Sequence, residues 1–128
     1  MNKSYFIAVI FALSLFAVTG FANVAKDSLA ADVILTKILN AVENNDLNNF
    51  VIDGDNQFKA AITKQMFDGL NAMIAPRMKK GYKIVSLGTL NQQGCQIYLR
   101  KLVFKDGNDD ILVKLALRNG KVAGFWFQ

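Results

Sequence analysis

Histidine is absent from the 128-residue chain, and cysteine occurs once. The lack of histidine excludes Ser-His-Asp and Cys-His catalytic arrangements and metal sites built on imidazole. Because Cys95 is alone, an intramolecular disulfide and a thiolate zinc site are excluded as well. The sequence also contains neither a phosphate-binding loop nor a dinucleotide fingerprint. We therefore expect neither a metal nor a cofactor.

The lone thiol leaves two interpretations open. A free cysteine is either buried or a reactive or intermolecular site. Cys95 lies next to an apolar, alternating run, which favours burial.

The first 22 residues are typical of an export signal. Lys3 precedes the apolar run Tyr5–Val18, and small residues then lead to a favoured cleavage site after Ala22. An uncleaved membrane anchor is the alternative, because no further charge occurs until Lys26. No basic stop-transfer cluster follows, which favours cleavage.

Cleavage at that site divides the chain into a signal peptide, residues 1–22, and a single mature domain, residues 23–128. A domain of about 100 residues is long enough for a modest hydrophobic core. The sequence thus predicts an exported, periplasmic or secreted protein that meets a membrane only during export.

Charge is distributed unevenly along the chain. Residues 23–55 hold six acids against two lysines, whereas residues 56–128 hold twelve Lys and Arg against four Asp. Such asymmetry can mark a surface for an acidic partner, a nucleic acid or an anionic membrane. The candidate cations are Arg77, Lys79, Lys80, Lys83, Arg100 and Lys101. Because they are spaced rather than consecutive, we favour solvated side chains, and we expect no nucleic-acid partner for an exported protein.

Apolar spacing predicts helices in the first half of the mature domain. Between residues 28 and 43, apolar side chains recur at intervals of three and four, and Asp27 or Ser28 can cap this helix. A short second helix is predicted at residues 47–51.

A second long helix is expected to begin after Thr63, a good capping residue. Pro76 should kink this helix or end it early, because proline lacks the backbone donor and crowds the preceding turn. Gly81 is its natural stop. The apolar stripe consists of Phe67, Leu70, Met73, Ile74 and Met78.

Strand patterns occupy the remainder of the chain. In the second strand the apolar positions change parity, which we interpret as a bulge at Arg100–Lys101. Helices followed by an antiparallel sheet predict an α+β fold, with N-terminal helices packed on a curved four-stranded sheet. The four strands are expected at residues 82–90, 95–104, 110–118 and 121–128.

The dipeptide Asn119-Gly120 is a strong signal for a two-residue hairpin loop. Such a loop pairs Arg118 with Lys121 and leaves Leu112, Phe125 and Phe127 together on one face. Because a sheet with one buried face should alternate cleanly, these three side chains need cover from a ligand, a second subunit or the same chain. The other face should cover the helices and hold Ile111, Val113, Leu115, Leu117, Val122, Gly124 and Trp126.

Catalytic signals are weak. Carboxylates cluster at residues 53–55 and 106–110, and both segments are typical of turns rather than of a calcium loop. A carboxylate and a tyrosine in an apolar cavity could support proton transfer. The candidates are Tyr82 and Tyr98 with Asp55 or Asp68, although their spacing does not single them out.

The order of elements resembles the nuclear transport factor 2-like superfamily (the cystatin-like cone), and within it a small exported domain of unknown function. The similar segments are residues 41–46 before Phe50, residues 62–67, Gly81 and residues 120–125. The resemblance covers about residues 28–128 and implies a cone in which a curved sheet wraps the helices. That superfamily includes isomerases, dehydratases, ligand binders and dimerisation modules, so fold alone does not fix function. Its histidine-dependent members cannot be models for this chain.

The sequence favours an exported, non-catalytic binding or dimerisation module. Its partner would be a small apolar ligand, or a second copy docked on the open sheet face. The expected ligand or dimer surface comprises Leu112, Phe125, Phe127, Phe67, Tyr82 and Tyr98. The alternatives are a proton-transfer enzyme of the isomerase or dehydratase type, and an inhibitor or envelope-associated protein acting through its basic surface.

Overall fold

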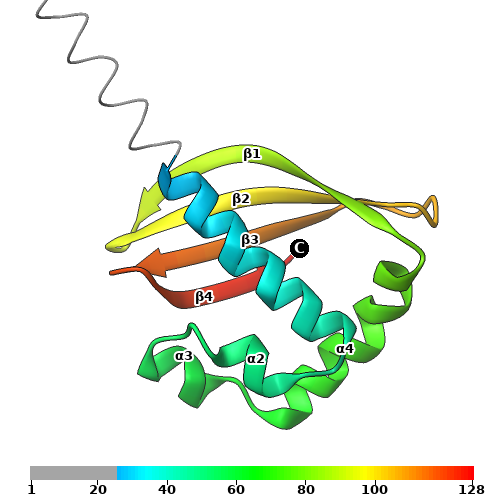
Figure 1. Ribbon diagram of the computed structural model, residues 1–128, viewed down its shortest axis with the longest axis horizontal. Helices are drawn as coiled ribbons and strands as arrows, with labels where there is room; N and C mark the ends of the chain where they lie inside the picture. Colours follow the sequence, from blue (N-terminus) through cyan, green and yellow to red (C-terminus); the bar gives the residue numbers. More distant parts are fainter. Residues whose placement is uncertain (1–25) are drawn as a thin grey trace, which may run out of the picture. The chain divides into compact units, whose positions relative to one another are not determined.

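The computed structural model describes residues 26–128, so the predicted signal peptide and its cleavage site lie outside the described residues. Residues 31–128 form one compact unit with α+β architecture (Figure 1). The first helix includes residues 31–43 of this unit. It is followed by α2 (Leu47–Val51), α3 (Asn56–Ala61), α4 (Lys64–Lys79), β1 (Tyr82–Gln92), β2 (Cys95–Phe104), β3 (Ile111–Arg118) and β4 (Lys121–Phe127).

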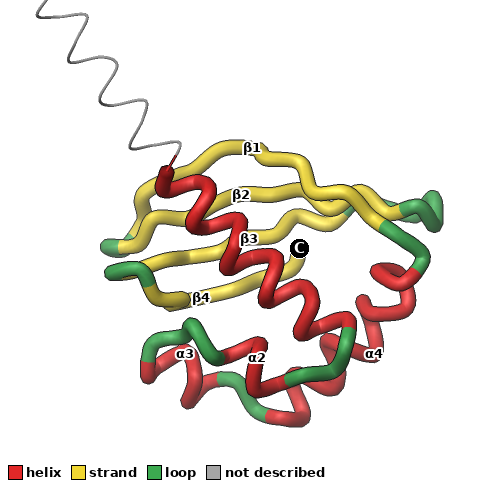
Figure 2. The backbone as a smooth tube through the Cα atoms, in the orientation of Figure 1, coloured by secondary structure: helices red, strands yellow, loops and turns green. Residues whose placement is uncertain are grey.

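The strands form one open antiparallel sheet in the order β1-β2-β3-β4, which confirms the α+β prediction. Tight turns join β1 to β2 and β3 to β4 at one end of the sheet, and the longer β2–β3 loop lies at the other end (Figure 2). The first helix runs across one face, which we call the inner face (Figure 1). The opposite face is the outer face.

The core lies between the first helix and the inner face. Both sides contribute side chains that are almost completely inaccessible to solvent, and burial of each large aliphatic side chain contributes about 1.5–3 kcal/mol. The helix contributes Leu35, Ile38, Leu39 and Val42, and the sheet contributes Tyr98, Leu102, Val113 and Leu115. The side-chain amide of Asn71 on α4 donates to the backbone carbonyl of Val42 and so ties α4 to the end of the first helix.

The predicted start and stop of α4 are confirmed. Thr63 Oγ1 accepts a hydrogen bond from the backbone N–H of Met66 at 3.2 Å. Gly81 has φ of 105° and donates its N–H to Met78 O at 2.9 Å. The early end predicted at Pro76 is wrong, since α4 continues to Lys79. Proline removes one donor, and the buried neighbours Ile74 and Met78 hold the helix against the core.

A short helix was not predicted. In α3, the Asp55 carboxylate accepts from the N–H of Phe58 at 2.8 Å and caps the helix. The sequence interpretation assigned residues 53–56, which include this capping residue, to a turn, because a capping residue and a turn residue have the same chemistry.

The predicted bulge in β2 is wrong. β2 pairs without interruption, whereas β1 carries the irregularity between Ser86 and Gly88. The change of apolar parity has another cause. Arg100 occupies an inward position between two apolar inner residues, while Ile97 points to the outer face.

A second bulge lies in β4 and alters which side chains face the core. Arg118 pairs with Lys121 as predicted, but Leu117 opposes Val122 and Ala116 opposes Gly124, so Ala123 is an extra residue. From Gly124 onward every side chain therefore lies on the face opposite to the predicted one.

Candidate functional site

The β4 bulge brings two aromatic side chains to the helix side of the sheet. Phe125 opposes Leu115 and Phe127 opposes Val113, both of which are inner-face core residues. The predicted grouping of Leu112 with Phe125 and Phe127 on an open face is wrong. The predicted position of Trp126 is also wrong, because Trp126 pairs with Lys114 on the outer face rather than covering the helices.

The backbone fixes this bulge from the edge of the sheet. Val122 donates its N–H to Asp53 O at 2.8 Å, and its carbonyl accepts from Asp55 N at 2.9 Å. The loop before α3 thus binds the first part of β4, and among residues 26–128 no other loop forms a backbone hydrogen bond with the free edge of this strand. Gly124, a glycine within a strand, is the sequence signal that could have located the bulge.

Beside the last residues of β4 lies an apolar groove of about 260 Å³, which we call the α4–β4 groove. Every side chain that lines it is apolar: Phe50, Ile62, Met66, Phe67, Leu70, Met73, Phe125, Trp126 and Phe127. Met66 is 58% exposed and Met73 is 64% exposed, so the wall formed by α4 is open to solvent. The sequence interpretation placed Met73 in the apolar stripe of this helix and missed Met66.

Aromatic contacts form the floor of the α4–β4 groove. The rings of Phe50 and Phe67 are 5.0 Å apart, and Phe125 meets Phe50 edge-on with centroids 5.8 Å apart. Phe127 meets Phe125 edge-on at 4.9 Å. Such edge-to-face pairs contribute about 0.5–1.5 kcal/mol each beyond their buried area. The groove therefore combines a floor of mutually packed aromatic rings with a flexible methionine wall.

The structure brings together three of the six predicted site residues, namely Phe67, Phe125 and Phe127. Leu112 lies on the outer face, where it pairs with Lys101 of β2. Tyr98 is buried in the core, and the ring of Tyr82 lies 6.1 Å from that of Phe104.

The residues considered for proton transfer are not assembled. Asp55 caps α3, and Asp68 forms an ion pair with Lys64. Among the described residues, neither carboxylate is hydrogen-bonded to a tyrosine. Burial raises the pKa of Tyr82, with a smaller contribution from the charge of Glu43.

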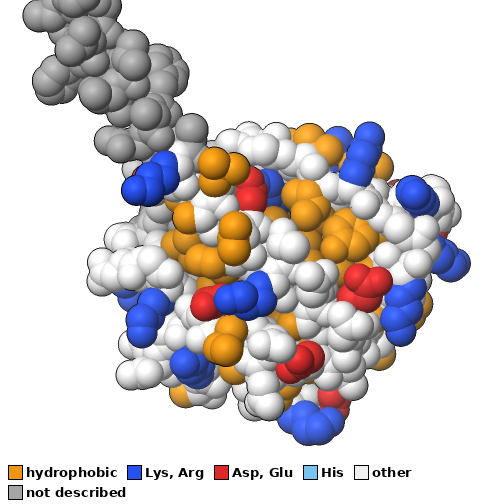
Figure 3. Space-filling model, viewed as in Figure 1, with side chains coloured by type: hydrophobic (Ala, Val, Ile, Leu, Met, Phe, Trp, Pro, Cys, Tyr) orange, Lys and Arg blue, Asp and Glu red, His pale blue; other side chains and the backbone are white. Residues whose placement is uncertain are grey.

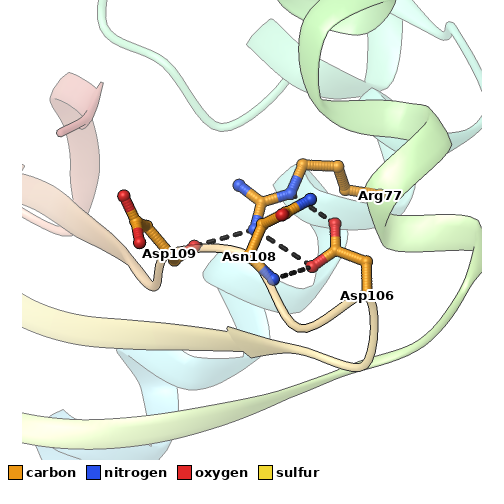
Figure 4. A network of polar contacts seen from close by, with 4 residues as sticks. All are labelled: Arg77, Asp106, Asn108 and Asp109. Carbon is orange, nitrogen blue, oxygen red and sulfur yellow. Dashed lines mark hydrogen bonds and ion pairs between the residues drawn. The ribbon is translucent and has the colours of Figure 1, made fainter.

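A polar network fixes the β2–β3 loop against α4 (Figure 4). Arg77 Nε donates to Asp106 at 2.7 Å, and Arg77 Nη2 donates to the carbonyl of Asp109 at 2.7 Å. The guanidinium lies 4.0 Å above the ring of Phe104. The hydrogen bond from Arg77, followed by that from the backbone N–H of Asn108, lowers the pKa of Asp106 to about 2. The segment 106–110, which the sequence predicts to be a turn, therefore also binds the end of α4.

This network predicts a specific acid sensitivity. A carboxyl whose pKa falls from 3.8 unfolded to about 2 folded stabilises the protein above the higher value, and the stabilisation is lost as pH falls toward 2. Asp106→Asn should flatten the decline of unfolding free energy between about pH 4 and pH 2, measured by urea denaturation. Asp109→Asn is the control, because Arg77 binds its backbone carbonyl. Equal slopes for the parent protein and Asp106→Asn would contradict this prediction.

Within residues 26–128, no group of three or more His, Cys, Asp or Glu side chains could hold a metal ion. No helix in the same range is long and apolar enough to cross a membrane.

Comparison with known proteins adds no identification. No family model, curated protein or solved structure matches the chain. The candidate function therefore depends on the geometry of the described residues.

Proposed function

We propose that the protein is a non-catalytic binding module that holds a small apolar or amphipathic ligand in the α4–β4 groove. The main support is the all-apolar lining of a groove that stays open to solvent at Met66 and Met73. Apolar surface left in water is unfavourable by about 25 cal/mol per Å², so a ligand that covers these side chains gains free energy.

The size of the groove restricts the ligand. Pockets for drug-sized molecules have volumes of about 300–1,000 Å³, and this groove, at about 260 Å³, suits a smaller molecule or one acyl or aryl portion of a larger one. Methionine side chains on one wall can adapt to different shapes. We therefore expect broad selectivity among apolar ligands.

The proposal includes two broader assignments. The apolar run at Tyr5–Val18 supports export with removal of residues 1–22. The order of helices before a four-stranded antiparallel sheet, together with bulges that bend β1 and β4, supports the resemblance to the nuclear transport factor 2-like cone. In that arrangement the ligand would lie where the helices meet the sheet edge.

Binding of the uncharged fluorophore N-phenyl-1-naphthylamine tests the function. The parent protein should bind the dye and increase its emission, and Met73→Glu should weaken binding about tenfold or more, because a carboxylate at the wall must lose water when the dye binds. Val33→Glu is the matched control, since Val33 is also helical and is 66% exposed. Absence of binding by the parent, or equal binding by Met73→Glu, would refute the assignment.

A further inference from the structure

The outer face of the sheet carries several cations, and its strands contribute no acidic side chain to that face. The outward positions of the four strands include Lys83, Lys101, Lys114, Arg118 and Lys121, and none of them is Asp or Glu. Acidic and basic side chains both occur on the helix-covered side (Figure 3). Among the described residues, Lys101 pairs with Asp110, whereas Lys114, Arg118 and Lys121 form no ion pair. The face therefore attracts anions.

Part of this face is hollowed into a shallow groove of about 410 Å³, which we call the outer groove. Its polar lining comes mainly from Gln92, Gln93, Lys114, Arg118 and Gln128, and no Asp or Glu lines it. Arg118 is positioned by a long hydrogen bond of 3.4 Å from Nη2 to the carbonyl of Gln93. The groove thus combines two cations with side-chain amides that both donate and accept hydrogen bonds.

Trp126 supplies an aromatic platform in the same groove. A Cβ at Gly124 would lie 2.1 Å from the indole Cη2 and 2.6 Å from Cζ3, so the indole rests directly on the glycine backbone. The side chain is nevertheless 48% exposed. One side of the ring therefore lies against the sheet, and the remainder is available to a ligand.

We propose that the outer groove binds an anionic saccharide, that is, sugar rings carrying sulfate, carboxylate or phosphate groups. Trp126 stacks against a ring, the glutamine amides bond to hydroxyl groups, and Lys114 and Arg118 bind the anionic substituent. This site is independent of the proposed function, although Trp126 borders both grooves.

The lining distinguishes this ligand from single-stranded nucleic acid. Nucleic-acid binding grooves use several aromatic side chains for successive bases and a track of cations for the phosphates. The outer groove has one aromatic side chain and two cations, but four glutamines line it, including Gln57 from α3. Hydroxyl-rich ligands match this excess of amides.

Trp126 is the only tryptophan of the chain, so its fluorescence reports directly on the groove. Titration of the purified protein with a heparin tetrasaccharide should change Trp126 emission saturably, and binding should weaken steeply with added salt. Maltotetraose, which is uncharged, and an eight-nucleotide oligo-dT serve as comparison ligands. No response to the heparin tetrasaccharide, or an equal response to maltotetraose, would overturn the proposal. Tighter binding of oligo-dT would overturn it in favour of nucleic acid.

Variants locate the site. Lys114→Gln and Arg118→Gln should each weaken binding of the heparin tetrasaccharide about fivefold or more, while Lys79→Gln on α4 should leave it unchanged. Gly124→Val should abolish binding by displacing the indole from the sheet. Urea midpoints establish that the cation variants remain folded. Unchanged affinity in both Lys114→Gln and Arg118→Gln would overturn the proposal.

Discussion

Asp32→Ala is expected to lower the free energy of unfolding by about 3 kcal/mol, because it removes a carboxylate that binds a buried guanidinium. Arg100 is 2% exposed on the inner face, and its Nε donates to the Asp32 carboxylate at 2.9 Å. Arg100 Nη1 also donates to Leu99 O at 3.0 Å. The effect stays at the lower end of the usual range because Asp32 is itself 47% exposed and water reaches the site.

The control for this pair is Asp68→Ala, which breaks the exposed ion pair between Lys64 and Asp68 one helical turn apart. That change should cost about 0.5 kcal/mol or less. Urea denaturation of both variants measures the difference.

A double variant separates two contributions to the lost stability: the loss of the Asp32–Arg100 attraction, and the cost of keeping the charge of Arg100 buried. Arg100→Met removes the charge and retains a side chain of similar length, so Asp32→Ala combined with Arg100→Met should be more stable than Asp32→Ala alone. If the double variant is instead less stable than Asp32→Ala by the full effect of Arg100→Met, the two side chains act independently. The buried charge of Arg100 is then not the cause of the lost stability.

Helix and strand positions could be predicted because periodicity and capping are local properties. Thr63 begins α4, Gly81 ends it and Asn119-Gly120 closes the hairpin, and each depends on neighbouring residues alone. Arg100 could not be assigned to the core from the sequence, because its counter-ion Asp32 is 68 residues away. The ion pair between Arg100 and a residue far away in the sequence therefore made the regular strand β2 look bulged in the sequence pattern.

The candidate site could be predicted only in part, because it too combines local patterns with long-range contacts. The sequence identifies Phe125 and Phe127 as side chains that need cover, and it leaves a ligand, a second subunit and the same chain open as the source of that cover. The structure supplies Phe50 and Phe67 of the same chain, after the extra residue Ala123 moves the aromatic side chains inward. The bulge in β4 is held by hydrogen bonds between Val122 and residues 53 and 55. These long-range bonds cannot be predicted from the local pattern, in which Gly124 is the one signal of a bulge.

The second prediction with a large expected loss of stability tests which side chains of β4 face the core. Phe125→Glu should destabilise the protein by about 4 kcal/mol or more, because it places a carboxylate among the rings of Phe50 and Phe127. Trp126→Glu should change stability by about 1 kcal/mol or less, because the outer face is open and Lys114 lies directly opposite.

Urea unfolding of Phe125→Glu and Trp126→Glu, compared with the parent protein, is the most direct test of the β4 register. We predict that Phe125→Glu is severely destabilised or unfolded and that Trp126→Glu unfolds near the parent midpoint. A strongly destabilised Trp126→Glu beside a nearly unchanged Phe125→Glu would contradict the register, and with it the placement of both grooves.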